Sequence, residues 1–89
     1  MDIEFNPANS AINTKKHGVS LLFGTNVFND EDMLAIPTIR VEDGERRFRA
    51  IGMVTNRLWT VIFVARNGRH RFISVRKSNV SETRTYNCP

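Results

Sequence analysis

LWTVIFVARNGRHRFISVR, residues 58–76, carries the clearest folding signal in the chain. Its first part, Leu58 to Arg66, is strongly apolar and rich in β-branched and aromatic residues, which is typical of a buried strand. Asn67-Gly68 follows, and both residues accept the positive φ angles of a type I′ turn. The stretch therefore predicts a β-hairpin in which Arg69 to Arg76 returns as the antiparallel partner.

Weaker strand signals lie on the N-terminal side of this hairpin. Arg46 to Val54 predicts a further strand. Residues 33–40 predict an edge strand, because Pro37 has no N–H to give to a neighbouring strand. Glu42-Asp43-Gly44 predicts a turn, and residues 2–5 alternate as a short first strand would.

Two helices are expected before these strands. Asn6 is a good N-cap, Pro7 suits the first helical position and Gly18 suits the position that ends a helix. A second helix is predicted from Ser20 to about Phe28, where apolar residues cover much of the circumference. Gly24 weakens that helix.

The order of these elements predicts the fold class. Ser78 to Tyr86 is polar and predicts a short C-terminal helix. We therefore expect an α+β fold: two N-terminal helices packed on a twisted antiparallel β-sheet of three to four strands, with a short C-terminal helix. At 89 residues the chain is expected to form a single domain, residues 1–89.

The composition is that of an ordinary globular domain, with 40% hydrophobic and 25% charged residues. No apolar run approaches the roughly 18 residues of a membrane-spanning helix, and MDIEFNPANS does not resemble a signal peptide. The one cysteine, Cys88, cannot form an internal disulfide. A cytoplasmic protein with no membrane partner is expected.

The net charge of +4 is unevenly distributed. Residues 1–44 carry three basic and seven acidic side chains, whereas residues 45–89 carry ten basic side chains and two acidic ones. Charge gathered in one half of a chain is typical of a protein with an anionic partner, commonly a nucleic acid. The alternative is a solvated surface neutralised by counterions.

The sequence has no motif for a metal or a cofactor: no zinc-ligand spacing, no glycine-rich phosphate loop and no serine nucleophile elbow. Lys16-His17 places two cations at the predicted end of the first helix, where they either stabilise the helix dipole or take part in chemistry. Glu82 and Tyr86 lie four residues apart, on one face of the last helix. The Tyr86 hydroxyl can transfer a proton or simply pack that helix onto the sheet.

The returning hairpin strand carries much of the positive charge. Alternation predicts two mixed faces, with Arg69, Arg71, Ile73 and Val75 on one, and His70, Phe72, Ser74 and Arg76 on the other. A sheet face of this kind can follow an RNA backbone, or its charges can merely protect a sheet edge from aggregation. Cleavage of RNA without a metal needs a base, an acid and cations near the phosphate, and the chain has such residue types.

Several short stretches, taken in order, resemble the BrnT family of bacterial toxins. They are IEFNP (3–7), NTKKHGVS (13–20), VFND (27–30), GERRFRAIGM (44–53), LWTVIFVARNGRHRFISVRKS (58–78) and ETRTY (82–86). The resemblance implies a RelE-like ribonuclease toxin of a type II toxin–antitoxin pair, which cleaves RNA without a metal and inhibits growth. It also implies an antitoxin similar to BrnA that binds the toxin directly. The complex would reach operator DNA only through the antitoxin, whose DNA-binding domain is of the ribbon-helix-helix type.

The resemblance also assigns candidate site residues. The family's KHG segment matches residues 16–18, its GEERF-type segment matches residues 44–48, its ISARKA segment matches residues 73–78, and its E-x-x-x-Y pattern matches residues 82–86. The implied phosphate-binding residues are Arg47, Arg76 and Lys77. The implied catalytic or base-contacting residues are Lys16, His17, Glu45 and Tyr86, with their individual roles left open.

Two departures from the family pattern support an alternative function. Residues 20–24 are SLLFG where the family usually has SFEEA, and the C-terminal segment lacks the usual density of arginine. The alternative is a catalytically weakened module of the same fold that binds RNA or the antitoxin. A repressor that binds DNA alone is disfavoured, because the chain has no helix-turn-helix pattern.

Overall fold

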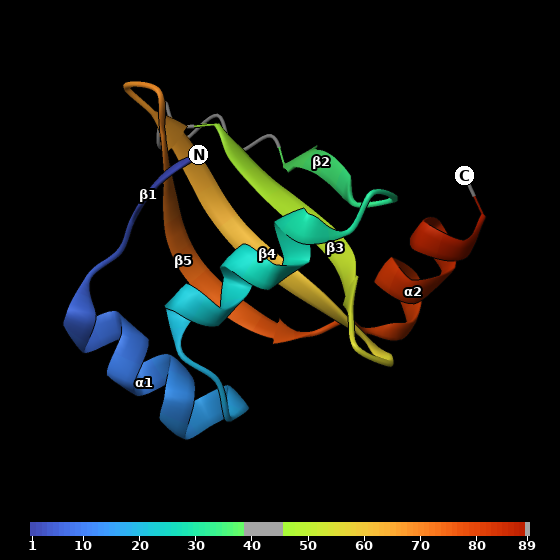
Figure 1. The fold of residues 1–89 in the computed structure, drawn as a ribbon, viewed down its shortest axis with the longest axis horizontal. Coiled ribbons are helices and arrows are strands. Elements are labelled where there is room, and N and C mark those ends of the chain that lie inside the picture. Colours follow the sequence, from blue (N-terminus) through green and yellow to red (C-terminus); the bar gives the residue numbers. More distant parts are fainter. Residues whose placement is uncertain (39–45, 89) are drawn as a thin grey trace.

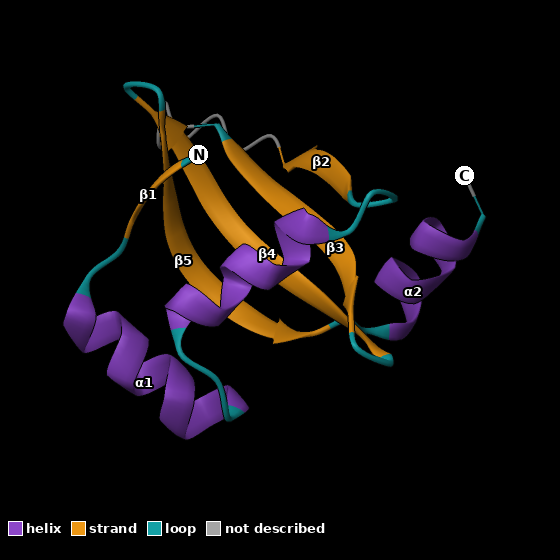
Figure 2. Cartoon of the chain, in the orientation of Figure 1, coloured by secondary structure: helices purple, strands orange, loops and turns teal. Residues whose placement is uncertain are grey.

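A five-stranded mixed sheet forms the centre of the protein in the computed structural model, which describes residues 1–38 and 46–88. The strands lie in the order β1-β5-β4-β3-β2 (Figure 1). Their bounds are β1 Asp2–Glu4, β2 Leu34–Thr38, β3 Arg47–Val54, β4 Arg57–Arg66 and β5 Arg69–Lys77. The helices are α1 Pro7–His17, η1 Leu21–Asn29 and α2 Val80–Asn87. Figure 2 shows η1 lying across the sheet, with α1 and α2 near opposite ends.

The predicted fold class is wrong. The sheet has five strands instead of three or four and is mixed instead of antiparallel, and the second helix is a 3₁₀ helix. β1 pairs in parallel with β5, whereas the other neighbours are antiparallel. The pairing of β1 was not predictable because three residues carry too little pattern to name a distant partner. Its Glu4 carboxylate lies 3.8 Å from the guanidinium groups of both Arg69 and Arg71, which favours this place beside β5.

The second helix is a 3₁₀ helix over Leu21–Asn29, and its three-residue turn explains which side chains it buries. Leu21, Gly24 and Val27 recur every third residue, and all three are buried against the sheet. A Cβ atom at Gly24 would lie 3.0 Å from side-chain carbons of Phe72, Val61 and Val75. Gly24 therefore allows η1 to approach the sheet closely.

The hairpin of β4 and β5 is confirmed, together with its turn. Asn67 and Gly68 both have positive φ angles, 50° and 75°. The predicted division of β5 into two faces is wrong, however, because the register changes from Ile62 opposite Ser74 to Phe63 opposite Phe72. This shift leaves Ile73 as an extra residue in a β-bulge. As a result Phe72 and Val75 both enter the core beneath η1.

The local signals for the first and last helices are confirmed. The Asn6 side chain caps α1 by accepting a hydrogen bond from Ala8 N at 2.8 Å, and Gly18 ends the helix with a φ of 81°. The C-terminal helix begins after Asn79, which caps Glu82 N at 2.8 Å. The predicted edge strand is present over residues 34–38, and the predicted turn at residues 42–44 lies outside the described residues.

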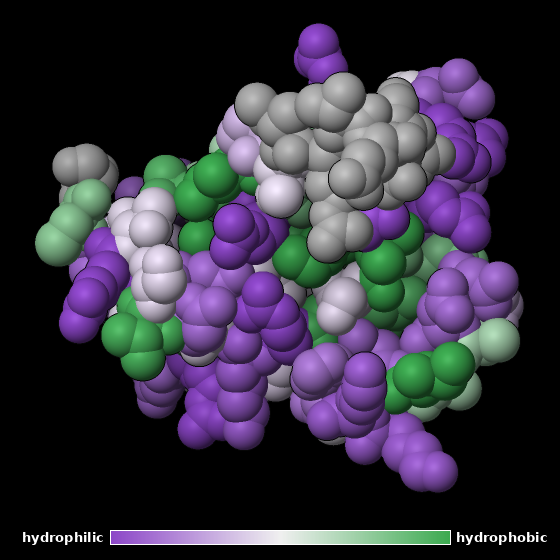
Figure 3. Space-filling model, turned by 180° about the vertical axis from the view of Figure 1, so that it is seen from behind, coloured by the Kyte–Doolittle hydropathy of each residue, from purple (hydrophilic) through white to green (hydrophobic). Residues whose placement is uncertain are grey.

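The face of the sheet opposite η1 is turned toward the viewer in Figure 3, where hydrophilic side chains gather with hydrophobic ones between them. Ala50 of β3 belongs to the core beneath η1. Because side chains alternate along a strand, Arg47 and Arg49 lie on the opposite face, which Figure 3 shows. None of the described helices is both long and apolar enough to cross a membrane.

Candidate functional site

Two pairs of basic residues meet where the end of α1 reaches the end of β5. Lys16 and His17 from α1 and Arg76 and Lys77 from β5 line a cavity of about 280 Å³, which we call the α1–β5 cavity. Four of the seven predicted site residues are therefore brought together. Sixty residues separate the two pairs in the sequence, so the fold alone creates this concentration of positive charge.

Asn13 holds α1 in this position. Its side chain is buried inside an otherwise polar helix, with 4% of its surface exposed. The amide nitrogen donates to Val75 O at 2.9 Å and to Val19 O at 2.7 Å, and the amide oxygen accepts from Val75 N at 3.0 Å. Because Asn13 lies one helical turn before Lys16 and His17, this attachment to β5 fixes both residues beside Arg76.

Arg76 is oriented by a buried carboxylate. Its two terminal nitrogens donate to the two oxygens of Glu82 at 2.7 and 2.8 Å, a bidentate pair. These hydrogen bonds raise the pKa of Arg76. The Arg76 side chain keeps 28% of its surface exposed and lines the α1–β5 cavity, so the pair with Glu82 holds it in a fixed orientation there.

Glu82 is the centre of a polar network that joins α2 to the sheet. It also accepts hydrogen bonds from Arg49, Thr60 and its own N-cap residue, Asn79. Burial alone would raise the pKa of Glu82, but the hydrogen bonds from Arg76, from Asn79 N and from Thr60, with the charge of Arg76, lower it to about 2. Glu82 is therefore ionised at neutral pH and acts as an anchor for arginine.

Arg47 lies on the same sheet face as Arg49 but farther from the cavity. It is opposite Val64 on β4, whereas Arg76 is opposite Thr60. Four residues along one strand correspond to about 13 Å. Arg47 therefore does not line the α1–β5 cavity, and its binding of a phosphate stays a prediction from the resemblance.

Tyr86 is separate from the α1–β5 cavity. Its hydroxyl donates to Asp30 Oδ2 at 2.6 Å, and the same oxygen accepts from Met53 N at 2.7 Å. The hydrogen bond to Asp30 raises the pKa of Tyr86 to about 12. The pKa of Asp30 itself is lowered, mostly by the hydrogen bond from Met53 N and also by those from Tyr86 and from Asp32 N. The contact joins α2 to the end of η1. Its role in catalysis stays a prediction from the resemblance.

Glu45, the remaining predicted site residue, lies outside the described residues. Within the described ranges, no three His, Cys, Asp or Glu side chains are grouped so that they could hold a metal ion.

Three important residues were not predicted as part of the site. Asn13 gave no signal, because a single polar residue in a polar helix is unremarkable. Glu82 and Asp30 act through partners on distant elements, which the sequence does not reveal. A capping-box pattern at Asn79 and Glu82 would have located the start of α2, but not the arginines that bind Glu82.

Comparison with known proteins identifies the family of the chain. The family model described as ribonuclease toxin, BrnT, of type II toxin–antitoxin system matches residues 5–82. This range includes both halves of the α1–β5 cavity and the Glu82 network. No curated protein gives a significant match to the sequence. The chain belongs to the BrnT family of type II toxin–antitoxin ribonuclease toxins.

Proposed function

We propose that this protein is a metal-independent endoribonuclease that cleaves cytoplasmic RNA, inhibits translation and growth, and is neutralised when its antitoxin binds it directly. The α1–β5 cavity is the observation that carries the proposal. It gathers an imidazole and three cations at a surface large enough for a phosphate group and its two ester oxygens. Such a set of groups suits a phosphodiester and its charged transition state.

The reaction that fits these groups uses the RNA's own 2′-hydroxyl as nucleophile. His17 takes the 2′-OH proton, the 2′-oxygen bonds to phosphorus, and the bond from phosphorus to the 5′-oxygen breaks. Lys16, Arg76 and Lys77 stabilise the additional negative charge on the phosphorane. The ammonium group of Lys16, which also lines the cavity, gives a proton to the leaving 5′-oxygen, so the products are a 2′,3′-cyclic phosphate and a 5′-hydroxyl.

The remaining predicted residues have supporting roles in this proposal. Arg47 binds a more distant phosphate of the same RNA strand, because it lies two strands across the sheet from Arg76 and about 13 Å farther along the strand direction. Glu45 and Tyr86 stay candidates for proton transfer or base contact, on the basis of the resemblance. The partner is an antitoxin similar to BrnA, with a ribbon-helix-helix domain that carries the complex to operator DNA.

The test is cleavage of a labelled single-stranded RNA by the purified chain in excess EDTA. The proposal predicts cleavage with cyclic-phosphate ends by the wild type, and loss of about a hundredfold or more in rate for His17→Ala. Lys15→Ala is the matched control for Lys16→Ala, because Lys15 is the adjacent lysine of α1 and does not line the cavity. An RNA that stays intact at high protein concentration would contradict the proposal.

The same experiment tests the alternative of a weakened binding module. That alternative predicts that the RNA, or a purified antitoxin, binds without being cut. Its support in the structure is that Arg76 is already paired with Glu82, which reduces the donors left for phosphate. Binding with no cleavage, both with EDTA and with added Mg²⁺, would favour the alternative.

A further inference from the structure

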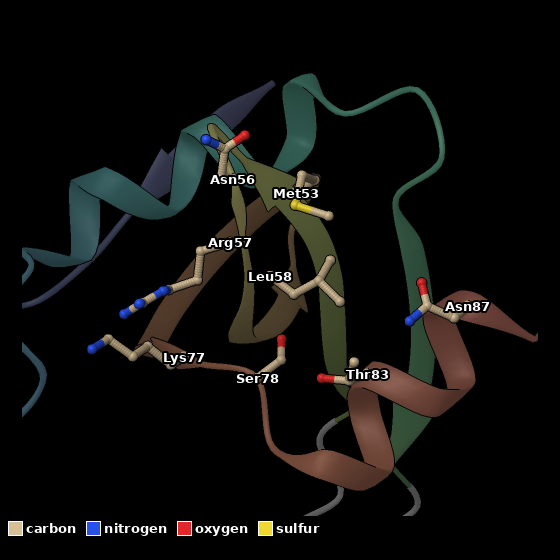
Figure 4. Close-up of a pocket in the computed structure, with 8 residues that line it drawn as sticks. All are labelled: Met53, Asn56, Arg57, Leu58, Lys77, Ser78, Thr83 and Asn87. Atoms are coloured by element: carbon tan, nitrogen blue, oxygen red, sulfur yellow. The ribbon is translucent and has the colours of Figure 1, made fainter.

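A second and larger cavity lies next to the α1–β5 cavity. It has a volume of about 420 Å³ and is bounded by the β3–β4 turn, the end of β5 and two residues of α2, so we call it the α2 cavity. Its lining residues are Met53, Asn56, Arg57, Leu58, Lys77, Ser78, Thr83 and Asn87 (Figure 4). Lys77 lines both cavities, which places the two side by side.

The α2 cavity has two kinds of wall. Met53 and Leu58 are directly paired across β3 and β4 and supply an apolar surface, although 39% of the Met53 surface is exposed. Figure 4 shows Arg57 and Lys77 on one side of the cavity and Thr83 and Asn87 of α2 on the other, with Leu58 between them. None of the described residues that line the cavity is acidic, so these residues present no negative charge to an anionic ligand.

The polar groups of the cavity can both donate and accept hydrogen bonds. The hydroxyl of Thr83 donates to Asn79 O at 2.8 Å. The Thr60 hydroxyl has one proton and donates it to Glu82. The hydrogen bond between Thr60 and Ser78 is therefore donated by the Ser78 hydroxyl. These two hydroxyls therefore face the cavity as acceptors.

The side-chain amide and guanidinium groups of the cavity have no partner in the part of the chain that the structure describes. Among the described residues, the side chains of Asn56, Asn87 and Arg57 make no hydrogen bond or ion pair. An amide carries two donor hydrogens and an acceptor oxygen. Two such groups beside an apolar floor match the edge and the face of a nucleobase.

We propose that the α2 cavity binds one unpaired nucleotide of an RNA strand, next to the phosphate held in the α1–β5 cavity. The base lies on Met53 and Leu58 with its edge toward Asn56 and Asn87, and its phosphate lies between Arg57 and Lys77. The proposal rests on the proposed function for its choice of RNA. It makes the cavity a specificity site, because a base in a stacked duplex cannot enter it.

The test measures binding separately from cleavage, in the His17→Ala background. The probes are short fluorescein-labelled single-stranded RNAs, each of one repeated base, measured by fluorescence anisotropy. Asn87→Ala is expected to weaken binding of the preferred RNA by roughly five- to tenfold and to reduce the difference between bases. Asn56→Ala should do the same. Asn26→Ala is the matched control, since Asn26 is an exposed residue of η1 away from the cavity.

The charged side of the cavity has its own measurement. Arg57→Gln should lower the slope of log affinity against log salt concentration by about 0.7, the value for one phosphate contact on a single strand. Circular dichroism melting checks that each variant is folded.

The outcomes separate this proposal from the proposed function. RNA that the wild type binds but does not cut, with Asn87→Ala still weakening binding in the His17→Ala background, supports the nucleotide site and contradicts the nuclease. RNA that is cut normally while Asn56→Ala and Asn87→Ala bind every probe like the control overturns the nucleotide site alone. Absence of RNA binding by the wild type overturns both.

Discussion

The side chain of Asn13 bonds to both backbone groups of Val75, donating to its carbonyl at 2.9 Å and accepting from its N–H at 3.0 Å. The amide therefore acts toward β5 as another strand would. Val75 immediately precedes Arg76 and Lys77, and Asn13 precedes Lys16 and His17 by one helical turn. One side chain thus sets the position of both halves of the α1–β5 cavity.

Asn13→Ala tests this relationship. The variant leaves the backbone groups of Val75 and the carbonyl of Val19 without their partner, so we expect a loss of about 2–3 kcal/mol in the free energy of unfolding, measured in urea. Cleavage should fall by roughly tenfold to a hundredfold even well below the melting temperature, because His17 is displaced from the phosphate. Asn26→Ala should match the wild type in both measurements. Normal cleavage by folded Asn13→Ala would show that the α1–β5 contact does not position the site.

Alanine variants of Arg76 and Arg49 separate an effect on cleavage from an effect on stability. Both donate to Glu82, but only Arg76 also lines the α1–β5 cavity. We expect each alanine variant to lower the free energy of unfolding by about 1–3 kcal/mol, with the larger loss for Arg76→Ala because its bidentate pair is closer. Cleavage should be lost in Arg76→Ala and largely kept in Arg49→Ala, when both are compared at a temperature at which they are folded. Equal loss of cleavage would mean that Arg76 acts only through the Glu82 network.

The low pKa of Glu82 makes stability depend on acidity. The pKa is about 2 in the folded protein against an ordinary value of 4.5, so the unfolded chain takes up the proton first as pH falls. The stabilisation is complete above pH 4.5 and is lost as pH falls through this range to about 2. Its size is at most roughly 3 kcal/mol.

Urea unfolding over a series of pH values measures this effect. Glu82→Gln should be less stable than the wild type at neutral pH and should lose less stability in acid. Glu31→Gln is the control, because Glu31 is exposed after η1. Parallel pH curves for the wild type and Glu82→Gln would contradict the assignment.

Local signals predicted much of the fold. Asn6 and Gly18 mark the two ends of α1, and Asn67-Gly68 specifies the β4–β5 turn, because in each case the deciding atoms lie within a few residues. The parallel pairing of β1 joins it to residues 69–71, more than sixty residues away in the sequence. The bulge at Ile73 was hidden for a related reason: alternation assumes an unbroken register, and one extra residue reverses every face that follows it.

The candidate site was predictable only as separate pieces. The resemblance selected Lys16-His17 and Arg76-Lys77, which the fold brings to one cavity. The sequence did not reveal that Glu82 would be ionised and buried beneath Arg76. That result depends on Thr60 and Arg49 from two other strands, and such convergence follows from tertiary packing alone.

Tyr86→Phe distinguishes a structural role from a catalytic one. Tyr86 is the only tyrosine in the chain, so its ionisation can be followed by the absorbance of tyrosinate. The bond to Asp30 raises the pKa of Tyr86 to about 12 from an ordinary value of 10.0, and the stabilisation from this bond is therefore present below pH 10 and lost as pH rises through about 12. If the hydroxyl only joins α2 to η1, Tyr86→Phe should lower the melting temperature and leave cleavage by the folded variant within about twofold, because Asp30 still accepts from Met53 and Asp32. A folded Tyr86→Phe variant that no longer cuts RNA, while still binding it, would instead place the tyrosine in proton transfer, and α2 would then have to move away from Asp30 when RNA binds.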